Sequence, residues 1–83
     1  MSSPAPAILR LPQALAQTGD SRSTHYLKII RGLMTQPVRL GERAVGWPKH
    51  EIDAILNARI AGKSDEEIRD LVVTLEVARK AAA

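Results

Sequence analysis

The sequence has no cysteine and no phenylalanine, and it has only one tryptophan and one tyrosine among its 83 residues. The absence of cysteine excludes disulfide bonds, thiolate metal ligands and cysteine nucleophiles. With so few aromatic residues, the core has to be built from Leu, Ile, Val and Ala, which suit packed helices better than a large sheet. We therefore expect a mostly helical fold that packing alone stabilises.

Long apolar runs are missing as well. No stretch approaches the roughly 20 apolar residues that span a bilayer. Residues 1–7 lack the positively charged start and the apolar run of a signal peptide. These absences predict a cytoplasmic protein without a membrane partner. A chain of 83 residues has room for one compact domain, and we expect residues 1–7 to be a disordered lead.

Charge is distributed unevenly along the chain, whose net charge is +3. Residues 1–63 carry nine Lys or Arg against four Asp or Glu, whereas residues 64–83 carry three against five. Within residues 21–43, five basic residues stand against the single acid Glu42. A local excess of this kind favours a polyanionic partner.

Two short helices around a tight turn are predicted over residues 11–31. The first covers residues 11–17 and ends at Gly19, and the second follows an N-cap at Ser21 and stops before Gly32. Apolar residues at helical spacing define the face that each helix buries. The predicted buried side chains are Leu11, Ala14, Leu15, Tyr26, Ile29 and Ile30.

A two-stranded β-ribbon is predicted next, from strand-like runs at residues 36–40 and 44–47 around a glycine-containing turn. A ribbon of two strands is marginally stable by itself. It therefore has to pack against the helices through Val38, Val45 or Trp47. A ribbon placed in this way is the wing of a winged helix-turn-helix.

Two further helices complete the prediction. The third begins near Pro48 or Lys49 and ends at Gly62. The fourth begins with a capping box, in which Ser64 and Glu67 satisfy each other's backbone N–H groups. Their apolar stripes are Ile52, Ile55, Leu56 and Ile60 in the third helix, and Ile68, Leu71, Val72 and Leu75 in the fourth.

These elements predict a winged helix-turn-helix domain over residues 8–62 and an amphipathic C-terminal helix over residues 63–83. The acidic polar face of the last helix disfavours anionic lipid. Two alternatives remain for this helix: it packs on its own domain, or it mediates oligomerisation. If it serves self-association, removal of residues 64–83 is expected to abolish cooperative binding to the partner and to leave folding intact.

The start of the second helix is the candidate DNA-reading segment, and we call this helix the recognition helix. Helix-turn-helix proteins place the first residues of that helix at base edges, while nearby cations hold phosphates. The candidates in the recognition helix are Arg22, Ser23, Thr24, His25 and Lys28, and those at the wing and the DNA backbone are Arg31, Arg39 and Arg43. Spacing alone is equally compatible with the solvated surface of a helical hairpin.

Three segments together resemble the AlpA family of phage-type regulators and excisionases. They are residues 9–12 (LRLP), residues 18–26 (TGDSRSTHY) and residues 37–47 (PVRLGERAVGW), and the resemblance covers about residues 8–61. The sequence departs from the family pattern at Asp20, which replaces an apolar residue, at His25, which replaces an aliphatic one, and at residues 34–35, which replace an aromatic residue and a proline.

The resemblance implies a winged helix-turn-helix related to MerR-like DNA-binding domains. It implies an excisionase, also called a recombination directionality factor, that assembles on attachment-site DNA so that a partner integrase excises a mobile element. Regulation of transcription, in addition or as the only role, is the alternative. The partners implied are double-stranded DNA, a site-specific integrase and further copies of the chain side by side on DNA.

Catalysis and metal binding find little support. The only histidines are His25 and His50, and no series of nucleophile, base and orienting group is visible. Two distant histidines without cysteine do not form a zinc site. We expect no enzyme activity, no cofactor and no small-molecule substrate. The remaining alternative is a helical protein-interaction module, which steep weakening of duplex binding by salt would exclude.

Overall fold

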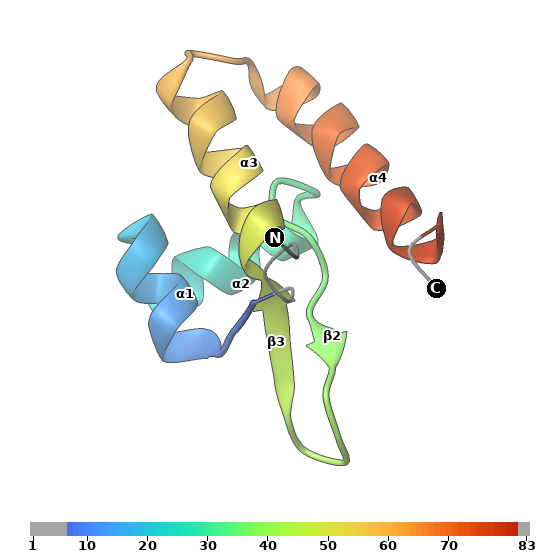
Figure 1. Ribbon diagram of the computed structural model, residues 1–83. Coiled ribbons are helices and arrows are strands. Elements are labelled where there is room, and N and C mark those ends of the chain that lie inside the picture. Colours follow the sequence, from blue (N-terminus) through green and yellow to red (C-terminus); the bar gives the residue numbers. More distant parts are fainter. Residues whose placement is uncertain (1–6, 82–83) are drawn as a thin grey trace, which may run out of the picture.

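Four helices and three short strands form residues 7–81, the part of the chain that the computed structural model describes (Figure 1). The strands are β1 (Ile8–Leu9), β2 (Val38–Arg39) and β3 (Val45–Pro48), and the helices are α1 (Leu11–Thr18), α2 (Arg22–Ile30), α3 (Lys49–Ile60) and α4 (Asp65–Ala81). The predicted fold class, mostly helical with a small β-ribbon, is confirmed. Within residues 7–81, no helix is long and apolar enough to cross a membrane.

Local signals place the turn between α1 and α2. α1 ends where Gly19 adopts a left-handed conformation with φ of 77°, and its N–H donates to the Leu15 carbonyl at 2.8 Å. A residue with a Cβ rarely adopts this conformation. α2 follows directly, because the Ser21 hydroxyl accepts a hydrogen bond from the Thr24 N–H at 3.2 Å. Each helix ends within one residue of its predicted position.

β3 is the central strand of a three-stranded antiparallel sheet with the order β1-β3-β2. The sequence predicts only β2 and β3, because a glycine-containing turn joins these two strands, whereas β1 pairs with a strand far along the chain and has no turn signal beside it. Leu9 of β1 pairs with Trp47, and the Ala7 carbonyl accepts a hydrogen bond from the Lys49 N–H at 2.8 Å. Ala7 is therefore held in the fold, whereas residues 1–6 of the predicted lead lie outside the described residues.

The close approach of β1 to β3 requires a glycine at position 46. A Cβ there would overlap the Ile8 side chain and would lie 3.0 Å from the Leu9 carbonyl oxygen. It would also lie 3.1 Å from a methyl group of Leu40. Gly46 thus lets the N-terminal strand and the hairpin meet in one sheet.

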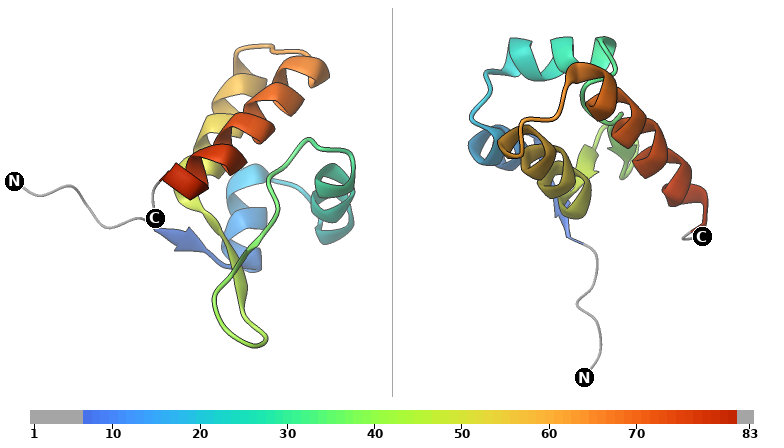
Figure 2. Two further views of the ribbon diagram at one scale, coloured as in Figure 1. Left: turned by 90° about the vertical axis from the view of Figure 1, so that its right-hand side faces the viewer. Right: turned by 90° about the horizontal axis from the view of Figure 1, so that it is seen from above.

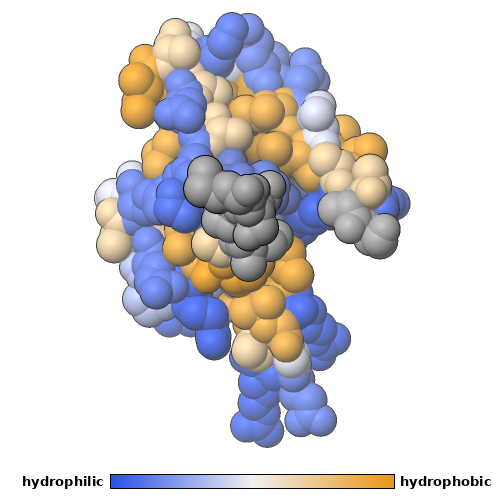
Figure 3. Space-filling view, viewed as in Figure 1, coloured by the Kyte–Doolittle hydropathy of each residue, from blue (hydrophilic) through white to orange (hydrophobic). Residues whose placement is uncertain are grey.

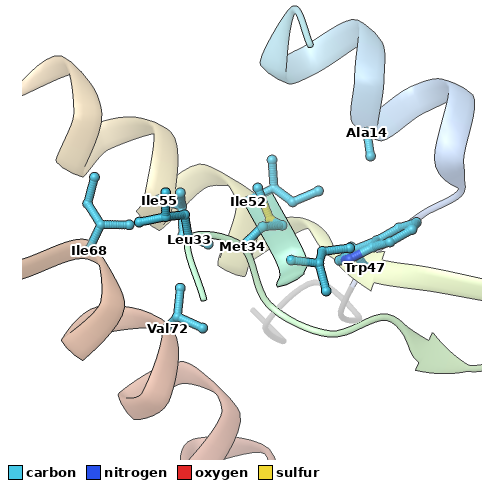
Figure 4. Close-up of a cluster of buried hydrophobic side chains, with 9 residues drawn as sticks. Ala14, Leu33, Met34, Trp47, Ile52, Ile55, Ile68 and Val72 are labelled. Carbon is cyan, nitrogen blue, oxygen red and sulfur yellow. The ribbon is translucent and has the colours of Figure 1, made fainter. Parts of the chain in front are cut away.

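One apolar cluster joins the four helices to β3 (Figure 4). Trp47 is fully buried in it, and its indole Nε1–H donates to the Thr35 carbonyl at 3.0 Å. That hydrogen bond ties β3 to the connection between α2 and β2. The buried members of the cluster are Ala14, Ile29, Leu33, Met34, Trp47, Ile52, Ile55, Ile68 and Val72.

Two predicted core positions are wrong. Ile30 is 80% exposed and Ile60 is 83% exposed. Each is the last residue of its helix. The core-facing side of α2 is set by Ile29, and the next residue is turned by about 100° around the helix axis. Ile60 follows Ile55 by five residues, a spacing that likewise turns it away from the core side.

α4 packs on its own domain, because Ile68 and Val72 belong to the same core as α1 to α3. Its predicted capping box is present: the Glu67 N–H donates to the Ser64 hydroxyl at 3.2 Å, and the Ser64 N–H donates to the Glu67 carboxylate at 3.1 Å. This shared core argues against the expectation that residues 64–83 can be removed without loss of folding. Their removal would expose the core face of α3 to water.

The C-terminal half of α4 forms hydrogen bonds with the connection that joins α2 to β2. Glu76 accepts a hydrogen bond from the Gln36 N–H at 2.8 Å, and Arg79 donates to the Gln36 carbonyl at 2.7 Å. Arg79 also donates through Nε and Nη2 to both carboxylate oxygens of Glu51 at 2.7 and 2.6 Å. Glu51 is fully buried, so the guanidinium neutralises a charge that has no access to solvent.

Replacement of Arg79 by methionine should destabilise the fold by about 3 kcal/mol, because it leaves the buried Glu51 carboxylate without a partner. The free energy of unfolding in urea measures the effect. The double variant Glu51→Leu, Arg79→Met should recover most of the loss, since two apolar side chains replace the pair.

Lys80→Met is the matched control, because Lys80 is exposed and adjacent on the same helix. It should change the unfolding free energy little. A double variant as unstable as the single Arg79→Met variant would contradict the assignment of the loss to the buried charge.

Candidate nucleic-acid interface

The first turn of α2 presents three of the predicted DNA-reading residues. Arg22, Ser23 and Thr24 are exposed there, directly after the Ser21 N-cap. The Ser21 hydroxyl also donates to the Thr24 hydroxyl oxygen at 2.9 Å, which fixes the orientation of that side chain. The Arg22 guanidinium lies 6.0 Å from the centre of the Tyr26 ring. An exposed helix N-terminus with one guanidinium and two hydroxyls can donate to base edges and phosphates.

His25 does not belong to this exposed set, and its prediction as a DNA contact is wrong. The residue is fully buried, and its ring stands edge-on to Trp47 with 4.6 Å between ring centres. The reason is helical geometry: His25 and Ile29 lie four residues apart on the side of α2 that faces the core. The departure from the family pattern at this position therefore alters the core and leaves the surface unchanged.

Lys28, which was predicted to contact DNA, forms an ion pair within the protein. Its ammonium group lies 2.7 Å from the Asp20 carboxylate, and the two side chains are only 24% and 15% exposed. Asp20 lies in the turn between α1 and α2, so the pair ties the middle of the recognition helix back to the turn. The acid at position 20 thus has a partner within the protein, and the two opposite charges form a partly buried ion pair.

The predicted wing residues are exposed. Arg39 lies in β2 and Arg43 in the turn that follows, which is closed by a hydrogen bond of 2.7 Å from the Leu40 N–H to the Ala44 carbonyl. The tip of the hairpin projects from the domain and is hydrophilic in Figure 3, whereas apolar residues lie directly above it on the same face. The tip can therefore reach a neighbouring surface while its base stays packed.

Arg31 is exposed at the C-cap of α2, and its carbonyl accepts a hydrogen bond from Arg69 Nε at 2.9 Å. In the left view of Figure 2, the C-terminal end of α4 lies apart from α2, and the hairpin projects at the lower end of the domain. The exposed arginines of the candidate interface belong to α2, its C-cap and the hairpin. They are Arg22, Arg31, Arg39 and Arg43.

The sequence pattern gave no role to Leu27, which the structure adds to the exposed face of α2. Its side chain is 43% exposed. Leu27 follows Ser23 by four residues and Thr24 by three, so the three side chains share one helix face. That spacing is readable from the sequence, but only the observed burial of His25 and Ile29 shows which face points outward.

Neither ring nitrogen of His25 has a hydrogen-bond partner among the described residues. Burial lowers the pKa of His25 below its usual value, with a smaller opposing effect from the Asp20 carboxylate and a further lowering by Lys28. His25 is therefore a neutral core side chain. Among residues 7–81, no group of three or more acidic or histidine side chains is placed to hold a metal ion.

The lowered pKa of His25 predicts that stability falls as the pH drops. Below about pH 6.5 the unfolded chain takes up a proton on this histidine that the folded protein resists, so acid favours unfolding. Between pH 7.5 and 5.5 the unfolding free energy should decrease, with a limiting slope of about 1.4 kcal/mol per pH unit. Urea unfolding at a series of pH values measures this slope.

The variant His25→Leu should lose most of this pH dependence, whereas His50→Gln should keep it, because His50 is exposed at the start of α3. Equal pH dependence in the wild-type protein and in His25→Leu would show that other groups cause it.

Comparison with known proteins gives two matches. The family described as "Prophage CP4-57 regulatory protein (AlpA)" matches residues 7–60, which include α1, α2, the hairpin and α3. The uncharacterized protein ORF88 of Enterobacteria phage P4 is 40% identical over 55 residues, which cover 66% of this chain and 62% of ORF88. The chain thus matches about three fifths of the length of that relative. No solved structure matches the chain.

Proposed function

The chain belongs to the AlpA family of prophage regulatory proteins, and from this membership we propose that it binds specific sites in double-stranded DNA. The observation that carries the proposal is the exposed N-terminus of α2, where Arg22, Ser23 and Thr24 stand free of the core. The matched segment contains both α2 and the hairpin. The protein acts by binding, without catalysis.

In this proposal α2 enters the major groove with its N-terminal turn foremost. Arg22 makes a bidentate contact with a guanine, and Ser23 and Thr24 contact a base edge or a phosphate. Arg43 at the hairpin tip reaches the adjacent minor groove or the DNA backbone. Arg31 and Arg39 contact phosphates. Lys28 takes no part, because Asp20 neutralises it.

Arg22→Ala should weaken binding to the specific site by about 1–3 kcal/mol and relax the preference at one base pair. Arg43→Ala should weaken binding with a smaller change in preference, and it should lower the salt dependence of the binding constant. Titration of labelled duplexes over a series of salt concentrations measures both effects.

Lys63→Ala is the control, since Lys63 is exposed between α3 and α4, away from the proposed interface. A loss for Arg22→Ala that is equal on all sequences would make Arg22 a phosphate contact. Absence of duplex binding by the wild-type protein at low salt would overturn the proposal and favour a protein-interaction module.

The biological role that we propose is that of an excisionase. The protein assembles on the attachment-site DNA of a mobile element and promotes excision by that element's integrase. The alternative is a dedicated regulator of transcription, which the description of the matching family as regulatory favours. An integrase gene beside this gene would favour excision.

Self-association on DNA is part of this proposal, because a single small winged domain contacts few base pairs. α4 offers an outward stripe at intervals of three or four residues, formed by Glu66, Asp70, Val73 and Val77. Val73 and Val77 are 60% and 61% exposed, although the opposite face of the helix is buried. The stripe is available to a basic surface of a neighbouring copy, such as its hairpin.

An excision assay tests both parts of the role, with an attachment-site plasmid, the integrase of the same element and the purified protein. The wild-type protein should stimulate excision. It should also bind cooperatively, so that protection of a DNA segment longer than one domain covers rises over a narrow range of protein concentration. The double variant Val73→Ser, Val77→Ser should still fold, but it should lose the cooperativity of DNA binding and most of the stimulation of excision.

Ile60→Ser is the matched control, since it removes an exposed aliphatic side chain that lies outside the stripe. Binding at a promoter without any effect on excision would support the regulator instead. Unchanged cooperativity in the double variant would rule out the stripe as the contact.

A further inference from the structure

The middle of the recognition helix presents an apolar surface to the outside. Of the residues after Thr24, His25 and Ile29 are buried, and Lys28 is held by Asp20. Tyr26 is partly buried against the core, and Ile30 is exposed at the last position of the helix. Leu27 is the exposed side chain one turn beyond the hydroxyls of the first turn. The outward face of α2 therefore changes from hydrogen-bonding groups to an aliphatic group within one turn.

Leu27 has no donor or acceptor, so it cannot satisfy the hydrogen-bonding groups that most base edges present in the major groove. Contact with such a group would displace its water and leave it unpaired. The one apolar group that a standard base presents there is the C5-methyl group of thymine. An aliphatic side chain at this position in the groove thus suits one base of the four.

We propose that Leu27 is a specificity-determining residue that packs against the C5-methyl group of a thymine in the DNA site. The inference rests on the proposed DNA binding and adds the chemistry that the middle of α2 recognises. Ser23 and Thr24 share the helix face of Leu27, so the thymine lies next to the base pairs that the first turn contacts.

Exposed aliphatic residues are common on protein surfaces and usually have no role. Leu27 differs from the others by its place. Ile60, Val73 and Val77 are more exposed than Leu27, but they lie on α3 and α4. Ile8 and Leu40 are about as exposed as Leu27, but they lie in β1 and in the hairpin turn. Ile30 lies on α2, at its last residue and beside the Arg31 cap that Arg69 holds. Leu27 alone among these lies within one turn of the exposed first turn of α2.

The experiment replaces each thymine of a footprinted site in turn by deoxyuridine, which removes only the methyl group. The wild-type protein should lose about fourfold in affinity at one position, the factor expected for the burial of one methyl group. Leu27→Ala should bind the natural site more weakly and should show no further loss at that position. Leu27→Met, which keeps an apolar side chain of similar size, should retain the deoxyuridine effect.

Ile60→Ala is the matched control and should respond to deoxyuridine as the wild-type protein does. Urea unfolding of Leu27→Ala checks that any loss of binding does not come from unfolding. If the wild-type protein discriminates its site from random DNA but no deoxyuridine changes its affinity, the inference is wrong and the proposed function stands. The inference is also wrong if Leu27→Ala keeps the full deoxyuridine effect. Absence of specific duplex binding would instead overturn the proposed function.

Discussion

The packing of Trp47 is the interaction on which the arrangement of the recognition helix and the hairpin depends. Its ring packs against His25 of the recognition helix, and its indole N–H holds the Thr35 carbonyl in the connection to the hairpin. Trp47 itself belongs to β3, the strand that links β1 and β2. One side chain therefore joins the helix-turn-helix to the hairpin. In a chain without phenylalanine, this residue supplies the large apolar surface that such a joint needs.

α4 secures the same joint from the other side. Arg69 holds the Arg31 carbonyl at the end of the recognition helix, and Glu76 and Arg79 hold Gln36 ahead of β2. The helix lies outside the segment that matches the AlpA family, yet it supplies core residues and backbone contacts on both sides of the connection. Its inner face is structural, and only its outer face is available to another molecule.

The residues singled out in the sequence as departures from the family resemblance all take part in contacts that hold the recognition helix in place. Asp20 pairs with Lys28, His25 packs against Trp47, and Thr35 accepts the Trp47 hydrogen bond. All of these groups lie behind the exposed face of α2. These residues therefore concern how the recognition helix is held, and they lie behind its exposed first turn.

The sequence by itself determined the helices, the turn between α1 and α2 and the hairpin, because caps, glycines and apolar spacing act over a few neighbouring residues. It also pointed to Arg22 as a candidate contact. Only the tertiary structure decided that β1 joins the sheet, that His25 is buried, that Lys28 pairs with Asp20, and that Leu27 faces outward. The place of β1 depends on its pairing with β3. The other outcomes depend on which face of α2 meets Trp47 and Asp20, which is decided by contacts between residues far apart in the sequence or across a turn. Local spacing fixes the period of a helix, and packing fixes its rotation.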